Sequence, residues 1–152
     1  RSREFEGTGI NLNGIAFHPD EYLLVIKKSD GVLFKVSIKN PKLIQRVNLS
    51  TKMVGGDGVL LVDNNHMLVV ANSASGIKSN SVFSITTDNS WDSAKIVKIH
   101  KLDDVYPTTA VIKGDDIYVI HTSLNRLIGS KKKDRASLNY SGSILKIGSV
   151  EY

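Results

Sequence analysis

Short apolar runs separated by turn residues are the main pattern of this chain, and convincing helical periodicity is missing. The first group of runs reads GIAFHP, EYLLVIKK, GVLFKVSI and KLIQRVNL, with turn signals at residues 19–20 and 29–31. Within residues 32–38, Val, Phe, Val and Ile alternate with Leu, Lys and Ser, the period of two expected of a pleated strand. The group therefore predicts an antiparallel meander of about four strands.

Two further groups follow the same order. The second reads DGVLLVD, HMLVVAN, NSVFSIT and AKIVKIH; the third reads TTAVIKG and DIYVIHT and, after a long polar loop, SGSILKIG. Equivalent points lie 44 residues apart from Gly14 to Gly58, and 51 residues apart from Gly58 to Thr109. Repeats of this length, each a meander, are typical of β-propeller blades. We predict an all-β chain of three four-stranded blades, at about residues 9–50, 51–101 and 102–152.

A β-sandwich or an open barrel would also contain many short strands. The propeller is favoured because the units share an internal order: a short first strand, expected to line a central channel, precedes a strongly apolar second strand, expected to be buried on both faces. Three blades do not close a ring, since propellers have about four to eight. We therefore expect further blades from the same polypeptide or from a second chain. The start at Arg1 rather than Met also suggests a fragment or a processed product.

Charge and composition exclude several classes. The net charge is +5, but the basic residues are dispersed apart from a run at residues 131–133, which we interpret as a solvated loop, with phosphate binding as the alternative. Nucleic-acid and membrane partners are therefore not expected. The absence of cysteine excludes disulfides, thiolate chemistry and cysteine-based zinc sites. Two glycosylation sequons, at Asn48 and Asn139, weakly favour the secretory pathway over the cytoplasm.

Candidate chemistry lies in two similar phrases, NLNGIA and GGDGVL. Asn13 and Asp57 each precede a glycine at the entrance to a predicted innermost strand, in adjacent blades. Carboxylate and amide oxygens are ligands that Ca²⁺ accepts. Taken singly, Asn-Gly and Asp-Gly are more often simple turns. The matching position in two repeats adds weight to a site, and the glycine that follows would permit close backbone approach.

Three phrases in fixed order, NGIAFHPDEYLLVI with GVLFKVSI, GDGVLLVDNNHMLVVAN and PTTAVIKGDDIYVIHTS, resemble the C-terminal half of the senescence marker protein (regucalcin)/gluconolactonase family. The resemblance covers about residues 9–148; it is strongest to plant members, and strictosidine synthase is similar more distantly. It implies half of a six-bladed propeller with a divalent metal, most often Ca²⁺, in the channel. The metal ligands carried over are Asn13 and Asp57. The family's early Glu has no counterpart here, because Glu4 and Glu6 do not match it.

The resemblance also implies hydrolysis of a lactone or ester, with Asp57 as the catalytic base for a metal-bound water. The partner implied is the missing N-terminal half of the propeller, and the secreted plant relatives support the secretory pathway. The alternative function is a non-catalytic propeller that binds a small ligand or a protein through its end face. No G-x-S-x-G phrase supports a serine hydrolase.

The four histidines are less informative. His18 and His66 adjoin turns and are expected to be exposed, whereas His100 ends an outer strand. His121 ends the second strand of the last blade, where a structural hydrogen bond is the expected role. No two histidines have metal-ligand spacing.

Overall fold

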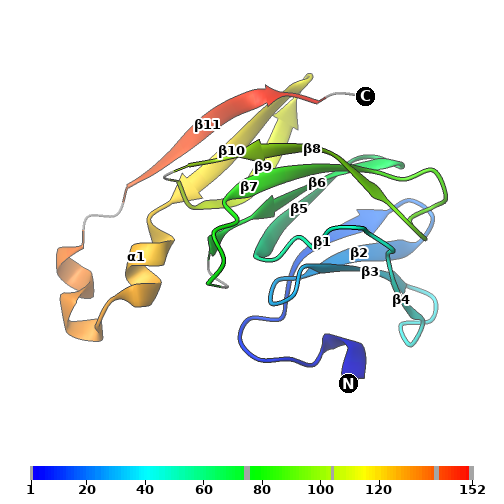
Figure 1. Cartoon of the computed structure of the whole chain (residues 1–152), viewed down its shortest axis with the longest axis horizontal. Coiled ribbons are helices and arrows are strands. Elements are labelled where there is room, and N and C mark those ends of the chain that lie inside the picture. Colours follow the sequence, from blue (N-terminus) through cyan, green and yellow to red (C-terminus); the bar gives the residue numbers. More distant parts are fainter. Residues whose placement is uncertain (1, 74–75, 104, 139–140, 151–152) are drawn as a thin grey trace.

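The computed structural model describes residues 2–73, 76–103, 105–138 and 141–150, and these form antiparallel sheets with little helix. Figure 1 shows three sheets side by side in chain order. The first contains β1 (Leu12–His18), β2 (Tyr22–Lys27), β3 (Val32–Ser37) and β4 (Ile44–Arg46); the second β5 (Gly56–Asp63), β6 (His66–Ala71), β7 (Ser81–Thr86) and β8 (Lys95–Lys101); the third β9 (Pro107–Lys113), β10 (Asp116–Thr122) and β11 (Gly142–Ser149).

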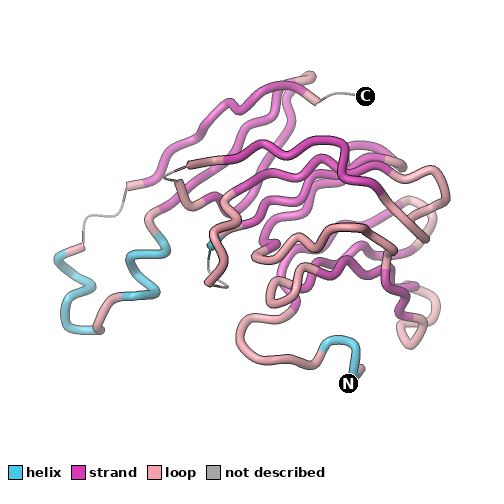
Figure 2. Tube along the Cα trace, in the orientation of Figure 1, coloured by secondary structure: helices cyan, strands magenta, loops and turns pink. Residues whose placement is uncertain are grey.

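Each sheet is a meander in which consecutive strands pair antiparallel. The all-β prediction is therefore confirmed, and the order of strands is consistent with a β-propeller-like fold. The expectation of four strands per sheet holds for the first two sheets, whereas the third has three strands among the described residues. Figure 2 shows how strand dominates the trace.

The middle sheet explains why the second strands are so apolar. All residues of β6 are buried. Met67, Val69 and Ala71 pack into a core shared with the first sheet, and Leu68 and Val70 pack into a core shared with the third. Because successive side chains of a strand point to opposite faces, a strand between two cores must be apolar at every position. In β10 only Ile117 and Val119 are fully buried, since only one face of the third sheet packs against another described sheet.

Glycines allow the first strands of neighbouring sheets to approach. A Cβ added to Gly14 would stand 2.3 Å from the backbone oxygen of Asp57, and one added to Gly58 would stand 2.7 Å from the backbone oxygen of Thr108. Both distances are far below van der Waals contact, so only glycine fits at either position. The expected close backbone approach after each polar residue is thereby confirmed.

Helices are few and short. η1 (Arg3–Phe5) places Phe5 against Phe34 of the first sheet, with ring centroids 5.3 Å apart. The polar segment after β10, expected to be a loop, contains α1 (Leu124–Gly129) and η3 (Lys132–Ser137). The loop expectation was wrong for these residues, because six-residue helices are too short to display an amphipathic period.

The basic run contributes Lys132 and Lys133 to η3, and all three of its lysines are exposed. The sequon at Asn48 lies on an exposed residue that bridges to Ser93, whereas Asn139 lies outside the described residues. Within the described part of the chain, no helix is long and apolar enough to cross a membrane.

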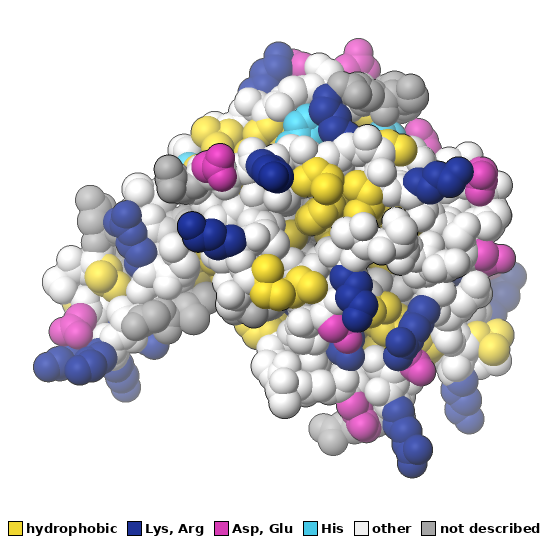
Figure 3. Space-filling view, viewed as in Figure 1, with side chains coloured by type: hydrophobic (Ala, Val, Ile, Leu, Met, Phe, Trp, Pro, Cys, Tyr) yellow, Lys and Arg dark blue, Asp and Glu magenta, His cyan; other side chains and the backbone are white. Residues whose placement is uncertain are grey.

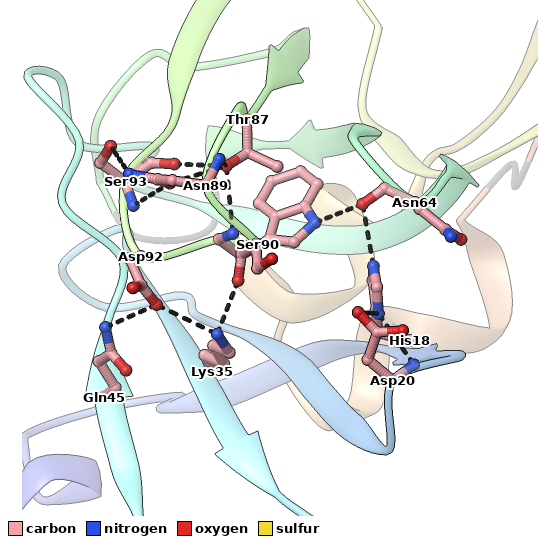
Figure 4. Close-up of polar contacts among 11 residues, drawn as sticks. His18, Asp20, Lys35, Gln45, Asn64, Thr87, Asn89, Ser90, Asp92 and Ser93 are labelled. Carbon is pink, nitrogen blue, oxygen red and sulfur yellow. Dashed lines mark hydrogen bonds and ion pairs between the residues drawn. The ribbon is translucent and has the colours of Figure 1, made fainter.

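His18 and His66 are buried, with 2% and 3% of their surface exposed, so the expectation of exposed histidines was wrong. The carbonyl oxygen of Asn64 accepts bonds from His18 Nε2 at 2.9 Å and from Trp91 Nε1 at 2.8 Å (Figure 4). A carbonyl only accepts, so His18 carries its proton on Nε2. A turn of the second sheet thus covers the end of β1, which sequence position alone did not indicate.

Candidate functional site

A β-bulge opens the first strand of each sheet. In the second sheet, Gly56 pairs with Ala71 and Gly58 with Val70, which leaves Asp57 as the extra residue. In the third sheet, Thr108 is left out in the same way between pairs made by Pro107 and Thr109. In the first sheet, Asn13 and Gly14 lie together in the irregularity after Leu12. Asn13, Asp57 and Thr108 therefore occupy equivalent positions in the three sheets. Bulges redirect side chains and are frequent beside functional sites.

Asp57 is held by a buried lysine. Lys28 follows β2, and its Nζ lies 3.0 Å from Asp57 Oδ2. The side chain of Lys28 is 2% exposed and that of Asp57 is 19% exposed. The ammonium therefore compensates the carboxylate from within the first sheet. A buried lysine of this kind requires such a partner, because desolvation of an isolated charge is very costly.

Asn72 completes the contact set. It follows β6, is fully buried, and accepts a bond from Lys28 Nζ at 2.9 Å on its side-chain oxygen. Its amide nitrogen donates to Asp57 Oδ2 and, at 2.9 Å, to the carbonyl oxygen of Pro107. Lys28 belongs to the first sheet, Asp57 and Asn72 to the second, and Pro107 to the third. One polar network therefore connects all three sheets at the end where their first strands begin.

Asn13 is placed differently from Asp57. It is exposed, and its side chain makes no hydrogen bond with another described residue. Gly14, directly after it, lies against the backbone of Asp57, so the two predicted ligands stand on adjacent strands. Among the described residues, no three His, Asp or Glu side chains are grouped so that they could hold a metal ion together.

A hollow of about 510 Å³ opens beside Asp57. Hydroxyl-bearing Thr108, Thr122, Ser123 and Ser141 line it together with Leu124 and Gly142, so its surface is mixed and largely apolar. Nearby Tyr106 is buried, and burial followed by the negative charge of Asp57 raises the pKa of its phenol. The hollow thus offers one carboxylate and several hydroxyl groups beside an apolar surface that includes Leu124, a set suited to a ligand with both polar and apolar faces.

Sequence reasoning missed Lys28 and Asn72, although a signal was present. The second strands end in VIKKS, VVANS and VIHTS, at residues 25–29, 69–73 and 119–123. Aligning these phrases places Lys28, Asn72 and Thr122 at the same position. A comparison of the second strands, as well as the first, would have marked all three as candidates.

The fold and this site define a propeller-like all-β protein with a polar network at one end of its sheets. No protein-family model matches the chain, and no curated protein matches it. Among solved structures, the crystal structure of the N-terminal domain of Nup159 is similar, with a TM-score of 0.38 and 11% identity. The match covers 93% of this chain and 46% of the Nup159 chain, so this chain spans about half of that length. A similarity at this level carries no functional argument.

Proposed function

We propose that this chain is part of a non-catalytic ligand-binding propeller, whose ligand occupies the hollow beside Asp57. The observation that carries the proposal is the ion pair between Lys28 and Asp57, with nitrogen and oxygen 3.0 Å apart. A divalent cation on Asp57 would have to approach a buried ammonium of the same sign. A general base takes a proton on a carboxylate oxygen, and one of the two Asp57 oxygens, Oδ2, is already occupied by Lys28 and Asn72.

The ligand that best suits the hollow is small and neutral, with hydroxyl groups for the Thr and Ser side chains and an apolar face for Leu124. Thr108, Thr122, Ser123 and Ser141 both donate and accept hydrogen bonds, which matches the mixed donors and acceptors of a sugar. A carboxylate such as Asp57 commonly accepts from a ligand hydroxyl, and a volume of about 510 Å³ is ordinary for a small-molecule site.

A second candidate is the metal-dependent lactone or ester hydrolase of the family that the sequence resembles. It is favoured by one observation: Asn13 and Asp57 occupy equivalent bulges on adjacent strands, with Gly14 against Asp57. In that reading both side chains bind Ca²⁺, and Asp57 also acts as the base. The remaining ligands would come from outside the described residues.

Calcium calorimetry separates the two candidates. The natively purified protein and its Asp57→Ala variant are titrated with Ca²⁺, and a panel of lactones and esters is assayed with and without the metal. The binding proposal expects no Asp57-dependent Ca²⁺ binding and no metal-dependent turnover. If the protein binds Ca²⁺ or shows metal-dependent turnover, and Asp57→Ala abolishes that property, the binding proposal is overturned in favour of the hydrolase. The positive test is saturation-transfer NMR with neutral mono- and disaccharides, which should give signals from bound sugar. Sugar signals that are the same in Asp57→Ala would contradict the proposal.

We further propose that the three sheets are half of a six-bladed ring, completed by the same polypeptide or by a second chain. The support is that the outer faces of the first and third sheets carry exposed apolar side chains. Ile15 and Phe17 are 57% and 58% exposed, and Val111 and Ile144 are 58% and 69% exposed. In a closed ring such faces pack against the neighbouring blades.

A further inference from the structure

A second cleft, of about 600 Å³, adjoins the hollow beside Asp57 and shares Thr122, Ser123 and Ser141 with it. One wall comes from the end of β8 and the residues that lead into β7, and the other from the end of β10 and the start of α1. The cleft therefore lies at the same end of the sheets as the polar network, but it is built from different charged residues.

Three cations line this cleft: Lys78, Lys101 and Arg126. All three are exposed, and none forms an ion pair with a described residue. Asp103 is the acidic residue of the lining, so the described lining carries a formal charge of +2. Cations gathered around a concave surface reinforce one another's potential and attract anions.

The cations of this cleft differ from four lysines of the first and third sheets. Lys27, Lys35, Lys39 and Lys146 each lie within 3.1 Å of a carboxylate oxygen. Their charges are therefore locally compensated, whereas those of the cleft face the open volume. The three cleft cations share one concave surface, where an anionic ligand would supply negative charge.

The rest of the lining supplies neutral hydrogen-bonding groups. Asn80 and Asn125 contribute amides, and Ser123 contributes a hydroxyl that donates to the carbonyl oxygen of Ser141 at 2.9 Å. His121 also lines the cleft, where its Nε2 lies 2.6 Å from Ser143 Oγ. Amides and hydroxyls of this kind recognise the hydroxyl groups of a polyol, while Arg and Lys recognise a phosphate.

We propose that this cleft binds a small phosphorylated polyol, with the phosphate on Lys101, Arg126 and Lys78 and the hydroxyl groups on the amide and serine side chains. Arg126 offers two parallel N–H groups that match two phosphate oxygens, and the lysines add point charges. The phosphate contacts of this site do not involve Asp57, and only Thr122, Ser123 and Ser141 are shared with the hollow beside that residue.

Calorimetry with glucose 6-phosphate tests the proposal, with glucose and inorganic phosphate as partial probes. The natively purified protein should bind glucose 6-phosphate more tightly than either probe, and added NaCl should weaken the binding. The double variant Lys101→Gln/Arg126→Gln should weaken it at least about tenfold, because it removes two charge-assisted contacts. Lys101→Gln alone is a milder second variant, and the fluorescence of buried Trp91 reports folding.

The matched control is Lys95→Gln/Lys113→Gln, which removes two exposed cations that do not line the cleft. Lys95 lies at the opposite end of β8 from Lys101. The control should leave the affinity unchanged. Equal weakening by the control would indicate general charge attraction. That result, absent binding of glucose 6-phosphate, or equally tight binding of inorganic phosphate would overturn the proposal.

Discussion

At the scale of single residues, the network around Asp57 depends on charge balance. Lys28 is the buried cation of the pair, and Asn72 fixes both partners by donating to the carboxylate and accepting from the ammonium. Buried pairs of this kind contribute little when compared with an apolar pair of the same shape, but they become costly when one partner is lost. The network is therefore vulnerable to single substitutions.

Lys28→Met should lower the free energy of unfolding by about 3 kcal/mol, because Asp57 is left partly buried without its cation. Urea denaturation followed by Trp91 fluorescence measures the change. Adding Asp57→Asn should recover part of the loss by removing the uncompensated charge. Lys35→Met breaks a more exposed pair with Asp92 and should have a clearly smaller effect. An equal loss in the two lysine variants would contradict the importance of burial.

His66 should make stability depend on pH. Burial lowers its pKa from 6.5, which the charge of Asp63 offsets only in part. The unfolded chain therefore binds more protons than the folded one below pH 6.5, so stability is full above that pH and is lost as pH falls toward the lowered pKa. Unfolding free energies at about pH 7.5 and about pH 5.5 should show the loss. His66→Gln should flatten the dependence, and an unchanged slope in that variant would assign it to other groups.

At the scale of elements, neighbouring sheets approach closely through their first strands. Gly14 and Gly58 lie against the backbone of the next sheet, and the cores between the sheets are formed largely by the second strands. This contact fixes the spacing of the bulges that carry Asn13, Asp57 and Thr108. A change in the spacing would therefore disturb the site as well as the packing.

Gly14→Ala and Gly58→Ala should each destabilise the protein by about 1–3 kcal/mol through overpacking. Gly114→Ala is the comparison, because a Cβ there meets open space and only its φ of 60° is unfavourable, a cost of about 1 kcal/mol. The crowded positions should also alter Lys28 and Asn72 signals in NMR spectra, whereas Gly114→Ala should not. If all three variants behaved alike, the strands would not be in close contact.

At the scale of the whole molecule, three sheets leave two outer faces with exposed apolar side chains. The face of the first sheet is covered in part by Phe5, which packs on Phe34, but Ile15 and Phe17 stay open to solvent. Figure 3 shows a further apolar group on this view, over β7 and β8, where Val97 and Ile99 are exposed. Exposed apolar patches of this kind commonly mark interaction surfaces.

The 152-residue chain produced alone should therefore self-associate or unfold in part, whereas the natively purified protein should be stable. Light scattering measures the mass, and Phe17→Glu with Ile144→Glu should reduce association by placing charges on both faces. Lys113→Glu is a control at an exposed polar position of the third sheet. A stable, well-folded monomer of this chain by itself would contradict the half-ring proposal.

Much of the fold could be predicted from the sequence. Strand periodicity, turn residues and the repeat of about 44 to 51 residues are local features, so they indicated the meanders and the equivalent glycines. The site was predicted only in part: Asn13 and Asp57 were marked by their phrases, and their roles as metal ligands stay a prediction. His18 and His66 were placed wrongly because their burial depends on a distant turn and on β7, which sequence neighbours do not report.

The sequence by itself determined the strand pattern and the three repeats. It also determined the polar residues Asn13 and Asp57, each placed before a glycine in the first two repeats. Only the tertiary structure decided that Lys28 pairs with Asp57, that Asn72 connects both to Pro107, and that Lys78, Lys101 and Arg126 surround one cleft. The physical reason is that hydrogen bonding and turn preference act between neighbours in the chain. Charge compensation acts through space. Lys28 and Asp57, for example, are 29 positions apart in the chain, and they meet only when the sheets are packed together.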